Sequence, residues 1–172
     1  MRNKIKTESI IETHKFASEL ANEINTQQRH FNFAVVIGLE GNLGGGKTTF
    51  TQGFAKALGV KENITSPTFV ILKKFNILNS TPYYSEDILL YNKSHVAYQE
   101  INKKQRTQKN LKSTGSTFKT LIHIDAYRIQ DSKEILDLGW DDLISNPENI
   151  IIVEWADKIL DIMPESHKWI TF

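Results

Sequence analysis

A short glycine-rich stretch carries the clearest chemistry in this chain. Residues 38–50 read GLEGNLGGGKTTF, and within them Gly41, Gly46, Lys47 and Thr48 satisfy the pattern G-x-x-x-x-G-K-[ST]. Glycines let the backbone turn with its N–H groups pointing inward, which makes a nest for phosphate oxygens. The lysine would bridge the β- and γ-phosphates, and the threonine hydroxyl would ligate Mg²⁺. The stretch predicts a site for a nucleoside triphosphate without identifying the base or the reaction.

The segments on either side of this loop are those that a phosphate loop requires. Residues 33–39 (FAVVIGL) form an apolar, partly β-branched run, which predicts a strand buried on both faces. Residues 47–58 predict a helix that Gly59 ends, and the positive end of its dipole would face the phosphates. The alternative is a flexible glycine-rich turn, which would not need Lys-Thr at this offset between a strand and a helix.

Two acidic residues follow apolar runs at places where a metal and a water molecule need carboxylates. Asp125 follows residues 121–124 (LIHI), and Glu154 follows residues 150–153 (IIIV). A carboxylate after a buried strand of an open α/β sheet lies at the edge where ligands bind. For each acid alone, an ordinary acidic residue at a strand end is the alternative. The presence of both suggests that one orders the metal and the other orients the attacking water.

Other residues near these motifs allow a functional and a structural interpretation. Residues 65–68 (TSPT) form a hydroxyl-rich segment stiffened by proline, which would close over the γ-phosphate or serve as a plain turn. Arg128 would reach the nucleotide or pair with a surface acid, and the pairing is favoured. Trp155 would stack on a base or a partner, although packing is the commoner role. His123 lies inside an apolar strand and is interpreted as a satisfied core histidine.

Periodicity in the rest of the chain predicts the elements that position these residues. Ser9 and Glu12 match a capping box, and an apolar face with a three-to-four-residue repeat follows it: Ile10, Thr13, Ala17, Leu20 and Ile24. Further strands are expected at 69–72, 121–124 and 150–153, and Asp131 with Glu134 would cap a short helix that Gly139 ends. The alternation predicts an α/β fold, the three-layer P-loop NTPase type, with a mainly parallel central sheet flanked by helices.

Length and composition favour one ordinary globular domain over residues 1–172. The chain is 40% hydrophobic and 24% charged, and it contains no run of the roughly 20 apolar residues that a membrane-spanning helix needs. Its first residues contain no apolar segment typical of a secretory signal. The absence of cysteine excludes disulfides, thiolate metal sites and thiol catalysis, and is consistent with a reducing cytosol. We therefore expect a cytoplasmic protein with no membrane association.

Residues 76–119 interrupt this pattern with a long polar segment. It is rich in Asn, Ser, Thr and Lys, lacks a clear apolar period, and is unusually long for a loop inside a compact domain. Residues 93–119 contain seven basic residues and one acidic residue, so this part carries +6 and the remainder −5 to reach the net charge of +1. We interpret 76–119 as a basic, flexible insertion.

Taken in order, six short motifs resemble the TsaE family. They are GNLGGGKTTF, ALG, TSPTF, HIDAYRI, LDLGWDD and VEWADK, and they extend over almost the whole chain. The family consists of small bacterial P-loop ATPases needed to make threonylcarbamoyladenosine in tRNA. The resemblance implies a single α/β domain that binds ATP and Mg²⁺ and hydrolyses ATP slowly. It also implies association with TsaD and TsaB, which transfer the threonylcarbamoyl group.

The resemblance also implies roles for individual residues. Lys47, Thr68, Asp125 and Glu154 would take part in hydrolysis, and Asp125 matches the acid of the family's DxYR motif. Mg²⁺ would be held by Thr48 and Glu154, with Asp125 as a further candidate. The nucleotide would contact two groups of residues: the loop (Leu43, Gly44, Gly45, Gly46, Lys47, Thr48 and Thr49) and, near the base, the first helix (Ile10 and Thr13).

Two departures from the family pattern affect what is expected. The family joins its TSPTF and DxYR strands by a short link, whereas this chain has the basic insertion, which would touch tRNA phosphates or an acidic partner, or be a solvated, partly disordered loop. Any other contact with tRNA would be indirect. The family usually continues past the point matching residues 169–172, which are expected here to form an exposed last strand.

Two other functions are compatible with a phosphate loop. A small-metabolite kinase with the insertion as a lid would need an acceptor pocket and a base, and no clear motif supplies either. A GTPase would carry Asn-Lys-x-Asp after a strand, but Asn92-Lys93 lacks the acid, as do the other two Asn-Lys pairs of the chain. The ATPase is the reading that the motifs favour, and the kinase is its alternative.

Overall fold

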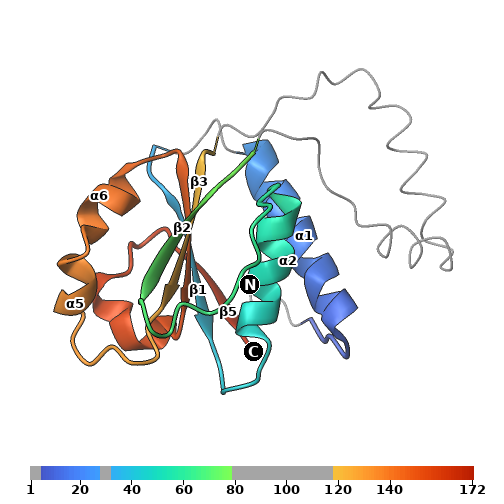
Figure 1. Ribbon diagram of the computed structural model, residues 1–172, viewed down its shortest axis with the longest axis horizontal. Helices are drawn as coiled ribbons and strands as arrows, with labels where there is room; N and C mark the ends of the chain where they lie inside the picture. Colours follow the sequence, from blue (N-terminus) through green and yellow to red (C-terminus); the bar gives the residue numbers. More distant parts are fainter. Residues whose placement is uncertain (1–4, 28–31, 79–117) are drawn as a thin grey trace, which may run out of the picture.

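The computed structural model describes residues 5–27, 32–78 and 118–172, which form three layers (Figure 1). A five-stranded sheet with the order β2-β3-β4-β1-β5 stands in the middle. Its strands are β1 (Val35–Glu40), β2 (Leu72–Asn76), β3 (Thr120–Asp125), β4 (Asn149–Glu154) and β5 (Lys168–Thr171). One face is covered by α1 (Ile10–Gln27) and α2 (Lys47–Ala57), and the other by α5 (Lys133–Leu136), α6 (Trp140–Ser145) and the 3₁₀ segment η2 (Ala156–Ile162). The predicted α/β class and three-layer arrangement are confirmed.

The register of the sheet brings the two predicted carboxylates together. Strands β3, β4, β1 and β5 are parallel, and the edge strand β2 runs antiparallel to β3. Asp125, the last residue of β3, is the register partner of Glu154, the last residue of β4. Because parallel strands end at the same edge of a sheet, the two carboxylates and the loop after β1 share one edge.

Apolar side chains form a core on each face of the sheet. Phe50 and Phe54 of α2 pack with the α1 face and with β-strand residues such as Ile37 and Ile152. On the opposite face the buried Trp140 packs with residues of β3, β4 and η2, and its indole Nε1 donates to the carbonyl oxygen of Ile162 at 3.0 Å. Burial of β1, β3 and β4 on both faces explains why their sequences are continuous apolar runs.

The first two helices lie close to their predicted positions. Ser9 Oγ accepts a hydrogen bond from the Glu12 backbone N–H at 3.2 Å, as a capping box requires. The Glu12 carboxylate, however, accepts from the Glu8 backbone N–H at 2.7 Å rather than from Ser9. Ala17 and Ile24 are buried as the periodicity predicts, whereas Ile10, at the exposed start of α1, is 65% exposed.

The strand predicted at 69–72 is wrong in its position. The backbone N–H groups of Val70 and Ile71 both donate to the carbonyl oxygen of Pro67, at 2.8 and 2.7 Å, so this part of the chain is a turn. Ile71 has φ 62°, a left-handed conformation that is unusual for a β-branched residue. Strand β2 begins only at Leu72, after this turn is complete.

Three other expectations concern the end of the α5 region, the sheet edge and the insertion. Helix α5 ends at Leu136, so Gly139 does not end it as predicted. Gly139, with φ 85°, is instead the residue immediately before α6. Of residues 169–172, the first three belong to β5, which pairs with β1 at the edge of the sheet as expected, and Phe172 follows the strand. Nearly all of the insertion, residues 79–117, lies outside the described residues. Within the described part of the chain, no helix has the length and apolar character needed to span a membrane.

Candidate functional site

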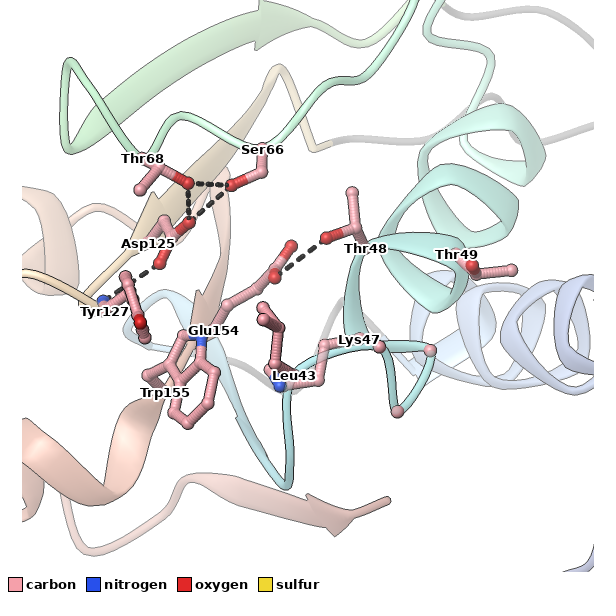
Figure 2. A pocket seen from close by; sticks show the side chains of 13 residues that line it. Leu43, Lys47, Thr48, Thr49, Ser66, Thr68, Asp125, Tyr127, Glu154 and Trp155 are labelled. Atoms are coloured by element: carbon pink, nitrogen blue, oxygen red, sulfur yellow. Dashed lines mark hydrogen bonds between the residues drawn. The ribbon is translucent and has the colours of Figure 1, made fainter.

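A cavity of about 320 Å³ opens at the edge of the sheet where β3 and β4 end (Figure 2). It is bordered by the loop after β1, the start of α2, the segment before β2, and the residues after β3 and β4. Its lining residues are Leu43, Gly44, Gly45, Gly46, Lys47, Thr48, Thr49, Ser66, Thr68, Asp125, Tyr127, Glu154 and Trp155. The structure therefore brings the predicted phosphate loop, the hydroxyl-rich segment and both acidic residues to one site.

The glycine-rich loop has a geometry that two of its glycines make possible. Gly46 precedes α2 with φ 103°, a left-handed conformation that side chains rarely adopt. Gly41 has φ 142°, and a Cβ there would lie 2.8 Å from the carbonyl oxygen of Phe172. Helix α2 starts at Lys47, so its N-terminal backbone N–H groups border the cavity. This arrangement can bind an anion.

Lys47 is a buried cation at the base of the cavity. Its Nζ donates to the carbonyl oxygens of Gly41 and Asn42, at 2.8 and 2.9 Å, and lies 3.9 Å from the centroid of the Trp155 ring. Burial lowers the pKa of Lys47 below its ordinary value, and the negative charge of Glu154 and of the other nearby acids opposes this effect. The ammonium group therefore donates to neutral carbonyl oxygens, and an anion in the cavity would be a stronger acceptor for it.

Glu154 is held from two sides of the cavity floor. Its Oε2 accepts a hydrogen bond from Thr48 Oγ1 at 2.9 Å, which joins the first turn of α2 to the end of β4 (Figure 2). Its Oε1 lies 2.8 Å from Nε2 of His123, a fully buried residue of β3. The carboxylate itself is buried, so both of its oxygens rely on these protein partners.

Asp125 is held by the hydroxyl-rich segment and by the chain that follows β3. Its Oδ2 contacts Ser66 Oγ and lies 2.5 Å from Thr68 Oγ1, while its Oδ1 accepts from the Tyr127 backbone N–H at 2.9 Å. The two hydroxyl oxygens are also 2.6 Å apart. Since each hydroxyl has a single proton, at most two of these three oxygen–oxygen contacts are hydrogen bonds at one time. Figure 2 shows this cluster beside the Thr48–Glu154 pair.

Aromatic side chains border the cavity on the side of the residues that follow β3 and β4. The centroids of the Tyr127 and Trp155 rings are 5.1 Å apart. Trp155 has φ 57° where the chain turns from β4 into η2. Tyr127 was not identified from the sequence, although its position two residues after Asp125 gave a signal. Arg128 does not line the cavity; its guanidinium lies 4.4 Å from the centroid of the Phe69 ring.

Three of the expected site residues either point away from Glu154 or do not line the cavity. Thr49 borders the cavity, but its side chain points away from Glu154 (Figure 2). Ile10 and Thr13 are on α1 and are not among the residues that line the cavity; the Thr13 hydroxyl contacts Thr7 Oγ1 at 3.0 Å. Their contact with a nucleotide base stays a prediction. His123, interpreted as a core residue, is buried as expected but contacts a site carboxylate.

The residues present fit an oxygen-bound divalent cation. Thr48 Oγ1 and Glu154 Oε2 are within hydrogen-bond distance of each other and belong to residues that line the same cavity. Mg²⁺ prefers oxygen ligands and is usually bound by one or two carboxylates together with substrate phosphates and water. Asp125, at the end of the neighbouring strand, is a second carboxylate within the site.

Comparison with known proteins identifies a family and a fold. A family model described as "Threonylcarbamoyl adenosine biosynthesis protein TsaE" matches residues 7–101 and 110–172. A protein of Bacillus subtilis named "tRNA threonylcarbamoyladenosine biosynthesis protein TsaE" is 32% identical over 130 residues, 76% of this chain and 56% of that protein. Proteins of the same name from Haemophilus influenzae and Aquifex aeolicus are 26% and 30% identical, over 80% and 92% of this chain and 61% and 81% of theirs.

A solved structure is similar in fold. The crystal structure of Bacillus subtilis YdiB is similar with a TM-score of 0.52 and 26% sequence identity, and the match covers 99% of this chain and 78% of that one. The chain covers less than two thirds of the length of the B. subtilis and H. influenzae relatives.

Proposed function

The chain belongs to the TsaE family, and from this premise we propose that it is a Mg²⁺-dependent ATPase that serves the threonylcarbamoyladenosine modification of tRNA. It would bind ATP at residues 41–49 and hydrolyse it slowly. The names of its relatives support the pathway, and the geometry of the cavity supports the chemistry. The hydrogen bond between Thr48 Oγ1 and Glu154 Oε2 is the observation that carries the proposal, because it joins the phosphate loop to a strand-end carboxylate.

Lys47 would bind the phosphates of ATP. Its Nζ now faces the carbonyl oxygens of Gly41 and Asn42, and phosphate oxygens are stronger acceptors for an ammonium because they are charged. The backbone N–H groups at the start of α2 would add uncharged donors and the positive end of the helix dipole. Together these groups would stabilise the negative charge that the β- and γ-phosphates carry in the transition state.

Thr48 and Glu154 would hold Mg²⁺, which when bound neutralises phosphate charge. The two side chains come from α2 and β4, both regular elements, and are already within hydrogen-bond distance of each other. A cation at this place would meet preformed ligands, which reduces the free energy needed to order them.

Asp125 would orient the attacking water. Its Oδ2 faces Ser66 and Thr68, and its Oδ1 accepts from the Tyr127 N–H. An ionised carboxylate has about four acceptor sites, so a site remains for a proton of water. Thr68 and Ser66 would fix the carboxylate, and their segment would respond to the γ-phosphate in the manner of a switch.

The modification itself would require partners. We propose that the chain acts in the cytoplasm with TsaD and TsaB, the proteins expected to transfer the threonylcarbamoyl group, and that it contacts tRNA indirectly or through the basic insertion. The ATPase cycle would support the transfer without performing it.

Purified TsaD and TsaB of the same organism provide the test. The chain should hydrolyse ATP slowly alone, and it should bind the two partners in size-exclusion chromatography with ATP and Mg²⁺. The matched control is the same mixture with the Lys47→Ala variant, which should bind ATP much more weakly. Robust phosphorylation of a small metabolite, with no association, would favour a kinase and contradict the proposal.

A further inference from the structure

His123 occupies a place in the sheet from which it reaches Glu154. It lies in the middle of β3 and is fully buried, and its register partner on β4 is Ile152. Side chains two residues apart on a strand point to the same face, and Asp125 is the register partner of Glu154. His123 and Glu154 are therefore diagonal neighbours on one face of adjacent strands, with Glu154 at the cavity and His123 one step deeper.

The contact between these two residues leaves the carboxylate little freedom. Nε2 of His123 lies 2.8 Å from Oε1 of Glu154, and Thr48 Oγ1 lies 2.9 Å from Oε2. One partner approaches from inside the sheet and the other from the start of α2. A carboxylate fixed at both oxygens presents the same orientation to whatever binds next to Thr48.

The second ring nitrogen indicates which way the hydrogen bond runs. Nδ1 of His123 is buried and has no hydrogen-bond partner among the residues that the structure describes. A proton on Nδ1 would be a buried donor without an acceptor, whereas a proton on Nε2 has the Glu154 carboxylate as its acceptor. The ring therefore carries its proton on Nε2 and donates to Oε1.

We propose that His123 is a positioning residue for Mg²⁺: its Nε2–H fixes Glu154 so that this carboxylate and Thr48 meet the cation together. This inference rests on the proposed function. Hydrogen bonds to a ligating carboxylate orient it, and the loss of such outer partners typically lowers metal affinity by about 10–100-fold. A histidine that merely filled the core would affect stability and leave the metal unaffected.

Three variants at this position separate a positioning role from a purely structural one. In His123→Gln the side-chain amide reaches about as far as Nε2 and can still donate to Glu154, whereas in His123→Asn the amide is too short to do so. His123→Leu removes every donor and keeps an apolar side chain in the core. The affinity for ATP is measured by calorimetry with Mg²⁺ and with EDTA, and the melting temperature of each variant is measured alongside.

The Gln variant should retain the Mg²⁺ dependence of ATP binding, and the Asn and Leu variants should lose Mg²⁺ affinity by about 10–100-fold while metal-free ATP binding stays unchanged. A wild-type Mg²⁺ dependence of ATP binding in the Asn and Leu variants, or an equal loss of Mg²⁺ affinity in all three variants, would overturn this inference but not the proposed function. ATP binding by the wild-type protein that is indifferent to Mg²⁺ would overturn the proposed function as well.

Nuclear magnetic resonance tests the same inference on the wild-type protein, whether or not the variants fold. The ¹⁵N shifts of the imidazole nitrogens distinguish a proton on Nε2 from one on Nδ1, and the signals of His123 are identified by assignment of the wild-type spectrum itself. Protonation on Nε2 is the expected result. A proton on Nδ1 would show that His123 accepts from or ignores Glu154, and would overturn the inference.

Discussion

The two carboxylates of the site end neighbouring strands, yet they are held by different kinds of structure. Glu154 is held by Thr48 of α2 and His123 of β3, both in regular elements. Asp125 is held by Ser66 and Thr68, which belong to the irregular segment between α2 and β2. Both carboxylates are almost fully buried, so the difference lies in their partners rather than in their exposure.

The segment that holds Asp125 also contains the unusual backbone of Ile71. The Asp125 backbone N–H donates to the Ile71 carbonyl oxygen at 2.9 Å, and Ile71 has φ 62°. Backbone conformations of this kind are found at switch regions and ligand-binding segments. Glu154, held by two regular elements, has the fixed position that a metal ligand needs. Asp125, held by the hydroxyl-rich segment, can respond if that segment moves when a γ-phosphate binds. On this basis we propose that Glu154 holds the metal and that Asp125 orients the water.

The largest effect is expected from loss of Lys47, because the proposed roles of both carboxylates depend on bound ATP. Lys47→Ala should lower the affinity for ATP by about 10²-fold or more, because two phosphate contacts are lost and hydrogen bonds to charged groups contribute about 1.5–3 kcal/mol each. Calorimetry with ATP and Mg²⁺ measures it, and the melting temperature checks the fold. Unchanged ATP affinity would mean that neither carboxylate faces a nucleotide, and the comparison between them would lose its basis.

A smaller effect is expected from a change in the hydroxyl-rich segment that holds Asp125. Thr68→Val keeps the shape of the side chain but removes the hydroxyl at 2.5 Å from Asp125 Oδ2. Hydrolysis should fall by about 10–100-fold, since one hydrogen bond to a charged acceptor is lost, while ATP and Mg²⁺ affinities stay near those of the wild type. Thr68→Ser, which keeps the hydroxyl, is the matched control. Loss of Mg²⁺ affinity in the Val variant would place the metal at Asp125.

The smallest effect lies outside both carboxylates, at the contact between α1 and α2. Burial, followed by the charge of Lys56, lowers the pKa of His14 below its ordinary value of 6.5. Between the folded pKa and 6.5 the unfolded chain binds more protons than the folded one, so stability falls as the pH decreases through this range. His14→Leu should show a smaller loss of melting temperature between pH 7 and pH 5 than the wild type. An equal or larger loss would contradict this assignment.

Much of the site was predictable because its signals are local. The phosphate loop is a contiguous motif between a strand and a helix, and Asp125 and Glu154 each follow an apolar run that marks a buried strand. The edge of a parallel sheet then brings them together without further information. The hydroxyl-rich segment at 65–68 was also visible in the sequence, and the family resemblance added a role for Thr68, which the structure places against Asp125.

What could not be predicted depends on contacts between distant segments. His123 reaches Glu154, 31 residues later, because β3 and β4 are parallel and in a particular register. The strand expected at 69–72 is a turn because the Pro67 carbonyl accepts two backbone N–H groups, which β-propensity does not reveal. Tyr127 borders the cavity through the path of the chain after β3, and its place two residues after Asp125 was the one local signal for it.

The division between the carboxylates is tested most directly by Glu154→Gln and Asp125→Asn measured side by side. For each variant, ATP affinity is determined over a range of Mg²⁺ concentrations, and hydrolysis is determined at saturating ATP. We expect Glu154→Gln to lose Mg²⁺ affinity by about 10–100-fold. Asp125→Asn should keep that affinity and hydrolyse ATP about 10²–10⁴-fold more slowly. The reverse pattern, or equal loss of Mg²⁺ affinity in both variants, would contradict the account.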